Sequence, residues 1–248
     1  MNSKKRLNVL GIGVDSYTLE ETADMLIDAM EKDQAASVYT PNSEIILYAY
    51  KNPDYAKVLN RGDFITPDGI GVVYASRILK KPLPERVSGF DLANVILKKI
   101  AGTKKRIYLF GGKPGVGEEA AKNICKLYPG TEICGTADGY FDEEKEQKII
   151  KDIQSKKPDL LFVCLGFPKQ ELWIDSHKDA LGAKVCMGLG GSLDVFAGTV
   201  KRAPKGFQKL GLEWLYRLLK QPSRAIRMLA LPKFGFTVLL HGKKFKND

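Results

Sequence analysis

The chain has 248 residues, of which 44% are hydrophobic and 27% are charged. This composition is typical of a folded globular protein and excludes an intrinsically disordered chain, a collagen-like repeat and a coiled coil. No stretch approaches the roughly 18 consecutive apolar residues of a membrane-spanning helix, and no signal-peptide apolar region follows the charged N-terminus. We therefore expect a cytoplasmic protein.

The positive charge is concentrated at the C-terminal end. The formal net charge is +10, and residues 201–248 contain 12 lysines and arginines but only two acidic residues, Glu213 and Asp248. This segment therefore accounts for the whole excess. A neutral body with a basic end predicts an anionic partner for that end: a membrane surface, a nucleic acid or a phosphorylated substrate. A basic face that serves only solubility is the alternative.

Short apolar runs alternate with amphipathic stretches along the first 200 residues. The runs lack polar alternation, as in parallel strands that are buried on both faces. We expect strands over Leu7–Ile12, Ser37–Thr40, Phe64–Thr66, Ile107–Phe110, Glu132–Gly135, Leu160–Leu165 and Lys184–Met187. We expect helices over Thr18–Glu31, Ser43–Leu59, Ile70–Leu79, Phe90–Ile100, Gly117–Tyr128, Glu143–Lys156 and Gln170–Leu181.

This alternation predicts an α/β protein with a mostly parallel sheet and flanking helices. The regular strand–helix units after Arg106 make the second half Rossmann-like. We expect one catalytic domain over residues 1–200, with two lobes at about 1–104 and 105–200. Thr18 with the following acidic residues fits a capping box, and Ser43 is the expected cap of its helix.

After residue 200 the sequence predicts a basic, helical appendage over 201–248. Apolar residues recur there at helical spacing, and Ser223 can cap a further helix. The apolar run Leu231–Leu240 is too short to cross a bilayer. Cationic amphipathic helices can lie in the membrane interface, so we expect contact with an anionic membrane. Docking of the same apolar stripe on the body is the alternative; the stripe consists of Phe207, Leu210, Trp214, Leu215 and Leu218.

Ligands of parallel sheets bind outside the carboxyl ends of the strands, and two such junctions carry reactive or hydrogen-bonding groups. Thr40 and Asn42 follow one apolar run and can bind a ligand, or they can form a turn with a local helix cap. Asp68 ends another run, where its carboxylate can act as a general base. An N-cap for the next helix is the alternative role of Asp68.

Four further junctions offer groups that can bind a ligand. Gly111 and Gly112 lie in a glycine-rich turn whose spacing fits neither a P-loop nor a dinucleotide-binding fingerprint, although its backbone N–H groups can hold a phosphate or carboxylate. Two further strand ends together offer aromatic, amide and carboxylate groups that can bracket a nucleotide base and ribose. These groups are on Asp138, Tyr140, Phe167, Lys169, Gln170 and Glu171.

The last junction, which follows Met187, suits a diphosphate or ribose, because its glycines expose backbone N–H donors before a helix. A carboxylate at a helix start is also a routine match to the helix dipole, so the role of its aspartate stays open. The residues are Gly190, Gly191, Ser192 and Asp194.

Absent motifs narrow the chemistry. Four cysteines form no Cys-x-x-Cys pair and indicate reduced core residues, and neither of the two histidines follows a predicted strand. A catalytic triad, a zinc site and a histidine-based metal site are therefore not expected. No Asp-x-Asp motif occurs, so the metal–diphosphate arrangement of many nucleotide-sugar transferases is missing. We expect no metal and no cofactor.

Several sequence blocks occur in an order that closely resembles the WecG/TagA/CpsF glycosyltransferases, over roughly residues 8–227. They are T-P-N-S-E at 40–44, T-P-D-G-I-G at 66–71, R-V-S-G-F-D at 86–91, L-G-F-P-K-Q-E at 165–171, G-L-G-G-S-L-D at 188–194 and A-G-T-V-K-R-A-P at 197–204.

The resemblance, strongest to the TagA branch, implies a metal-independent, inverting transfer of an N-acetylmannosamine-type sugar from a UDP donor. The acceptor is N-acetylglucosamine on a polyprenyl diphosphate at the cytoplasmic membrane face, and the product is the linkage disaccharide of wall teichoic acid. The resemblance also implies that Asp68 is the catalytic base and that the basic appendage contacts the membrane and helps to close the active site.

On this basis we assign roles to the candidate residues. Thr40, Asn42 and Gln170 position donor or acceptor hydroxyls, and Tyr140 and Asp194 contact the uridine or ribose. The diphosphate charge is stabilised in place of a metal by Arg86, Arg217, Arg224 and Arg227.

Some alternatives stay open. The donor can be the uronic acid form of N-acetylmannosamine, and the appendage can drive self-association in solution. A nicotinamide-dependent dehydrogenase is disfavoured by the glycine spacing after Phe110. A nucleic-acid-binding protein is disfavoured because no binding module is recognisable, so we expect no nucleic-acid partner.

Overall fold

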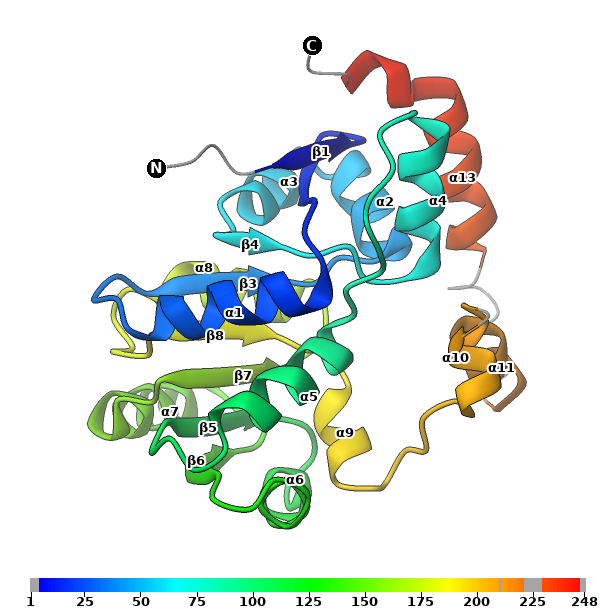
Figure 1. Ribbon diagram of the computed structural model, residues 1–248. Coiled ribbons are helices and arrows are strands. Elements are labelled where there is room, and N and C mark those ends of the chain that lie inside the picture. Colours follow the sequence, from blue (N-terminus) through cyan, green and yellow to red (C-terminus); the bar gives the residue numbers. More distant parts are fainter. Residues whose placement is uncertain (1–4, 210, 221–228, 246–248) are drawn as a thin grey trace.

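Six parallel strands form the central sheet of the computed structural model, which describes residues 5–209, 211–220 and 229–245. Strands from both halves of the chain join this one sheet, because the strand Val185–Gly188 lies between the strands Ala36–Tyr39 and Leu160–Cys164. The predicted parallel α/β fold is therefore confirmed. In spatial order the strands are β4 (Phe64–Ile65), β3 (Ala36–Tyr39), β8 (Val185–Gly188), β7 (Leu160–Cys164), β5 (Arg106–Gly111) and β6 (Glu132–Ala137) (Figure 1).

Helices cover both faces of the sheet, since alternate strand residues point into two separate apolar cores. On β5, for example, Tyr108 and Phe110 enter one core while Ile107 and Leu109 enter the other. The first core is closed by α2 (Ser43–Lys51), α3 (Pro53–Asn60), α7 (Glu143–Lys156) and α8 (Lys169–His177). The second is closed by α1 (Leu19–Met30), α5 (Gly89–Ile100), α6 (Val116–Leu127) and α9 (Ser192–Phe196).

The first predicted strand is wrong in length and placement. The chain there forms an antiparallel hairpin of β1 (Arg6–Val9) and β2 (Ile12–Asp15), outside the six-stranded sheet. The turn between them places Leu10 and Gly11 at φ 52° and 93°, which a continuous strand does not allow. The hairpin is tied to β4 because Asp15 accepts a hydrogen bond of 2.6 Å from the Ile65 N–H.

The predicted helix Ser43–Leu59 is two helices, because Pro53 has no N–H to donate and keeps Asn52 out of the helical region, at φ −127° and ψ 87°. Asn42 caps α2 through its side chain, so the expected cap at Ser43 was wrong by one residue. The capping box of Thr18 is confirmed.

The predicted core location holds for two of the four cysteines. Cys164 and Cys186 are buried, Cys134 is half-buried and Cys125 is exposed, and all four are free thiols. The location of Cys125 corrects the expectation of four core residues, because its helix α6 is amphipathic and turns this side chain to solvent.

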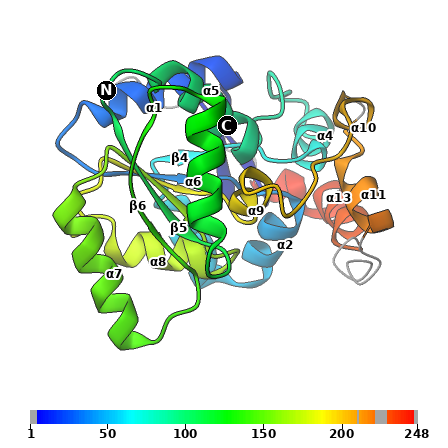
Figure 2. The same ribbon diagram turned by 90° about the horizontal axis from the view of Figure 1, so that it is seen from below.

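The appendage consists of α10 (Lys205–Lys209), α11 (Glu213–Lys220), α13 (Ala230–His241) and a short 3₁₀ helix at Gly242–Phe245. Gly211, at φ 69°, divides the predicted apolar stripe between α10 and α11. Leu210, Ser223, Arg224 and Arg227 lie outside the described residues. Figures 1 and 2 show α10, α11 and α13 gathered beside α4 (Ile70–Ile78).

Helix α13 has one buried and one exposed apolar face. Phe234 and Val238, which are not part of the predicted stripe, pack into the core against α2 and α4. Pro232 lies in the first helical turn, where its missing N–H is not required. No helix within the described ranges is both long and apolar enough to span a membrane. The exposed face carries Leu229, Phe236, Leu239 and Leu240.

Replacement of Gly111 should destabilise the sheet edge more than replacement of Gly115. Both glycines have positive φ, but a Cβ at Gly111 would overlap the Cys164 carbonyl of β7, whereas a Cβ at Gly115 meets nothing within 4 Å. We expect Gly115→Ala to lower the free energy of unfolding by about 1–2 kcal/mol through backbone strain alone. Gly111→Ala should lose a further 1–3 kcal/mol, roughly, through overpacking. Urea unfolding measures both; equal losses would contradict the close approach.

Candidate active site

The loop that carries Asp68 lies between two other loops at the carboxyl edge of the sheet. The Asp68 N–H donates to the Pro41 carbonyl at 3.3 Å, and the Pro67 carbonyl accepts from the Val87 N–H at 3.1 Å. The end of β4 is thereby held beside the end of β3 and beside the segment that begins with Arg86. The side chain of Asp68 is half-buried.

Asp68 is not the N-cap of α4, so this alternative is wrong. The N-cap is Gly69, at φ 90°, and no side chain caps that helix. Burial opposes the charge of Arg86, but its pKa is raised by Glu213 and by the nearby charges of Asp68 and Asp91, so Asp68 lies close to this guanidinium. A partly exposed carboxylate beside a cation, at the carboxyl end of a parallel strand, is suitably placed to act on a bound ligand.

Thr40 and Gln170 fix the backbone that follows β8. The Thr40 hydroxyl donates to the Gly188 carbonyl at 3.0 Å, and the Gly190 N–H donates to Gln170 Oε1 at 2.8 Å. Both side chains are buried. Asn42 accepts hydrogen bonds from the first amides of α2 through its Oδ1. The structure thus brings these three residues together with Asp68 at one end of the edge.

Glu171 lies beneath this group in the core, with 1% of its surface exposed. It accepts hydrogen bonds from Gln170 Nε2 at 2.8 Å and from the Tyr55 hydroxyl at 3.0 Å. Burial raises the pKa of its carboxyl above the usual value. Glu171 is therefore placed to orient the Gln170 amide.

Arg86 belongs to a network of two arginines and two carboxylates. It donates to Asp91 at 2.9 Å and to Glu213 at 2.8 Å. Arg202 forms ion pairs of 2.7 Å with Asp91 and 3.2 Å with Glu213. Because Glu213 is on α11 and Arg202 precedes α10, this network joins the appendage to the loop beside Asp68.

The network holds all four groups in their charged forms. Burial opposes the charge of Asp91 and Glu213, but hydrogen bonds and attraction from the two arginines outweigh it and lower the pKa of both carboxyls. Burial likewise opposes the arginine charges, and the carboxylates raise the pKa of Arg86 and Arg202. Two positive and two negative charges leave the network neutral.

A second group of predicted residues lies at the other end of the edge, after β5 and β6. Five strand spacings of about 4.8 Å separate β4 from β6, which is about 24 Å across the sheet. Gly111 and Gly112 follow β5, where Gly112 hydrogen-bonds β7. Asp138 follows β6 and is paired with Lys145 at 2.8 Å, and the Tyr140 side chain is exposed.

The remaining predicted binding residues follow β7 and β8, between the two groups. Phe167 packs edge-on against Tyr48, and the Lys169 ammonium lies 3.7 Å from the centre of the Phe141 ring. The Ser192 hydroxyl donates to the Leu189 carbonyl at 2.7 Å, at the start of the turn that follows β8. The residues of that turn and of the start of α9 include Gly190, Gly191, Ser192 and Asp194.

Sequence reasoning missed Asp91, Arg202 and Glu213 as site residues. Asp91 and Arg202 occur in two of the family-like blocks quoted above, and Glu213 is one of only two acidic residues in a basic segment. An isolated acid among cations is a signal for an ion pair. Arg217 is part of α11 but its side chain is outside the description, as are all parts of Arg224 and Arg227.

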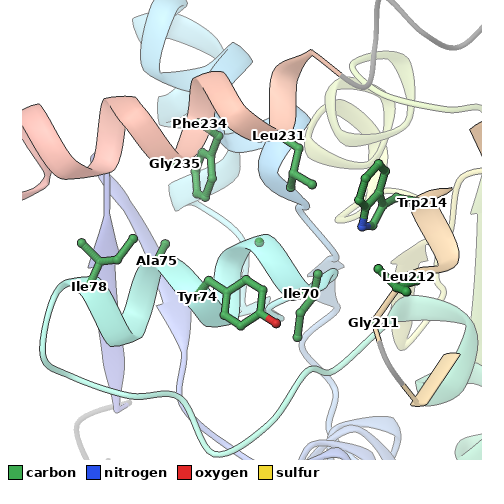
Figure 3. Close-up of a pocket in the computed structure, with 11 residues that line it drawn as sticks. Ile70, Tyr74, Ala75, Ile78, Gly211, Leu212, Trp214, Leu231, Phe234 and Gly235 are labelled. Atoms are coloured by element: carbon green, nitrogen blue, oxygen red, sulfur yellow. The ribbon is translucent and has the colours of Figure 1, made fainter. Parts of the chain in front are cut away.

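An apolar pocket of about 240 Å³ also escaped prediction. It lies between α4, α11 and α13, and its first α4 residue, Ile70, follows Asp68 by two positions. Figure 3 shows side chains of all three helices around it. Its lining includes Ile70, Tyr74, Leu212, Trp214, Leu231 and Phe234.

Among the described residues, no three histidine, cysteine, aspartate or glutamate side chains gather closely enough to hold a metal ion. The fold and the site define an α/β protein that places a carboxylate, arginines and an apolar pocket together at the carboxyl edge of its sheet.

The chain belongs to the WecG/TagA/CpsF family of glycosyltransferases, whose profile matches residues 7–248. It is 41% identical over 228 residues to a Bacillus spizizenii protein, covering 92% of this chain and 88% of that one. It is 42% identical to a Bacillus subtilis protein (89% and 87% covered) and 37% identical to a Staphylococcus aureus protein (97% and 95%). Each relative is named N-acetylglucosaminyldiphosphoundecaprenol N-acetyl-beta-D-mannosaminyltransferase.

Glu213→Gln should loosen the appendage. It removes one of two carboxylates that face two arginines, and we expect docking of α11 to weaken by about 1–2 kcal/mol. Removal of one partner from a fully buried ion pair costs roughly 3–5 kcal/mol. We expect a smaller loss here because the four side chains remain 13–26% exposed. Hydrogen exchange of residues 213–220 measures it. Glu144→Gln, which breaks an exposed pair with Lys148, is the control and should change nothing.

Low pH should also release α11 from the arginine–carboxylate network. Because the folded protein lowers the pKa of Asp91 and Glu213, their contribution is complete above the unfolded values of about 3.9 and 4.3 and is lost as pH falls through the lower, folded values. We expect protection of α11 to be constant from about pH 7 to 5 and to fall below about pH 4. A protein carrying Asp91→Asn and Glu213→Gln should lack this acid step; an identical step would assign it to other groups.

Proposed function

We propose that this protein transfers N-acetylmannosamine from a UDP donor to the 4-hydroxyl of N-acetylglucosamine on undecaprenyl diphosphate. The product is a ManNAc-β-1,4-GlcNAc disaccharide, the linkage unit of wall teichoic acid. Support comes from the names and identities of the three relatives, which align over most of their length with this chain. The observation that carries the proposal is the half-buried Asp68 carboxylate beside Arg86 at the carboxyl edge.

In this proposal Asp68 removes the proton from the acceptor hydroxyl as that oxygen attacks the anomeric carbon. The bond to the UDP oxygen breaks on the opposite side, so the configuration inverts in a single displacement. One carboxylate is sufficient because no covalent sugar–enzyme intermediate forms. The new β-linkage then has the configuration that the relatives' names state.

Arginines stabilise the charge that develops on the departing diphosphate. Arg86 is near enough to the proposed base for the charge of Asp68 to act on it, and Arg202 shares its carboxylate partners. Guanidinium groups bind phosphate oxygens through paired hydrogen bonds, which can replace a metal ion in this role. We include Arg217, Arg224 and Arg227 in this role as part of the proposal. The reaction is therefore proposed to need no metal or cofactor.

We also propose that the appendage contacts the inner face of the cell membrane. Its exposed apolar side chains on α13 lie beside basic residues such as Lys233, Lys243 and Lys244. Apolar insertion and attraction to anionic lipid act together on such a surface. The donor alternative, the uronic acid of N-acetylmannosamine, would add a carboxylate that requires a further cation near the sugar.

Asp68→Asn should abolish most turnover while the protein remains folded. Loss of a general base lowers kcat by about 10²–10⁴-fold. We expect the KM for UDP-N-acetylmannosamine to stay near the wild-type value, because the amide keeps the size of the carboxylate. Release of UDP, measured with a lipid-linked N-acetylglucosamine acceptor and EDTA, gives both constants. Asp179→Asn, at an exposed position, is the control; turnover of Asp68→Asn equal to this control would remove Asp68 from the mechanism.

A further inference from the structure

We propose that the apolar pocket between α4, α11 and α13 binds the first isoprene units of the acceptor's polyprenyl chain. This inference rests on the proposed function, because that function supplies a polyprenyl diphosphate. It adds a lipid subsite formed jointly by the body and the appendage. The occupant is the acceptor's own chain, rather than a bilayer lipid or a second copy of the protein.

The chemistry of the lining fits a branched hydrocarbon. Aliphatic and aromatic side chains line the pocket on all three helices, among them Ile70 on α4, Trp214 on α11 and Leu231 on α13 (Figure 3). Gly235 leaves room within it, because a Cβ at this position would meet nothing within 4 Å. A volume of about 240 Å³ admits only a short part of a polyprenyl chain.

The position of the pocket fits the head of the same molecule. Glu213 of α11 contacts Arg86, while the next residue, Trp214, lines the pocket. Asp68 and Ile70 are likewise two residues apart. The pocket therefore adjoins the loop that carries Asp68, so the sugar of a lipid-linked acceptor can reach the proposed base while its hydrocarbon chain enters the pocket.

The pocket also has a route for the rest of the chain. Tyr74 and Ile78, which line it, are 50% and 41% exposed. On the neighbouring helix α13, Phe236 and Leu239 are 67% and 58% exposed. An apolar path thus continues from the lining to the surface that we propose to contact the membrane. The later isoprene units can follow this path into the bilayer.

A variant that fills the pocket tests the assignment. A Cβ at Gly235 meets nothing within 4 Å, so Gly235→Phe adds a ring without backbone strain and in a helix that tolerates it. Gly206→Phe is the matched control, because Gly206 also has open space around it but does not line the pocket. Gly235→Ala is a second, smaller variant that should fold even if the phenylalanine variant does not.

Binding can be measured without catalysis. Trp214 is one of two tryptophans, so Trp173→Phe leaves it as the only indole reporter. We expect farnesyl diphosphate to shift the Trp214 emission and inorganic diphosphate at equal concentration to leave it unchanged. Gly235→Phe should weaken farnesyl diphosphate binding at least tenfold, which corresponds to the burial of about two methylene groups. Gly235→Ala should give a smaller loss, and Gly206→Phe none.

Several results would overturn the assignment. They are an equal shift with inorganic diphosphate, an equal loss in Gly235→Phe and Gly206→Phe, or no shift with farnesyl diphosphate. An emission shift that follows protein concentration without ligand would assign the pocket to a second copy. An equal shift with phosphatidylglycerol vesicles that farnesyl diphosphate does not reverse would assign it to bilayer lipid.

Kinetics separate this inference from the proposed function. N-acetylglucosamine diphosphate carrying a farnesyl group should have a KM at least tenfold below that of the same acceptor carrying a methyl group, and Gly235→Phe should remove the difference. Transfer to both acceptors with equal KM would contradict the pocket alone. Absence of transfer to either acceptor, with farnesyl diphosphate binding that Gly235→Phe weakens, would contradict the function and support the pocket.

Discussion

Two arginines and two carboxylates hold the appendage against the loop beside Asp68. Arg86 and Asp91 come from the segment that leads into α5, whereas Arg202 and Glu213 come from the chain beyond residue 200. The four side chains are too buried for water to solvate their charges fully, yet they are exposed enough for the ion pairs to open. Each charge therefore depends on the others, and a change in one of them affects both the edge of the sheet and the position of α11.

The position of α11 in turn decides whether the apolar pocket exists. Trp214 and Leu212 form one wall of it, while α4 and α13 form the others. The polar network and the pocket thus share helix α11, since Glu213 belongs to the network and the next residue, Trp214, lines the pocket. A lipid-linked substrate requires this adjacency, because its sugar has to reach Asp68 while its hydrocarbon chain lies in the pocket. The appendage is therefore part of the proposed acceptor site as well as a candidate membrane contact.

Local sequence signals predicted most of the elements, because they report on the backbone directly. The unbroken apolar runs at β5, β7 and β8 indicated strands buried on both faces, and the structure confirms them. Predictions failed where a short feature redirected the chain. The turn at Leu10 and Gly11 folds an apparent strand into a hairpin, and Pro53 divides an apparent helix. In both places one or two residues overrode an apolar pattern that was otherwise correct.

The sequence by itself determined the fold class, the family blocks and the candidates at each strand end, since these depend on local pattern and residue type. Only the tertiary structure decided which candidates meet. Thr40, Asn42, Asp68 and Gln170 converge because β4, β3 and β8 are neighbours, whereas Asp138 lies several strands away. Strand order, the ion pair of Glu213 with Arg86 and the pocket all arise from contacts between residues of different elements, many of them far apart in the sequence. No local pattern encodes such contacts, because they depend on how the packed layers assemble.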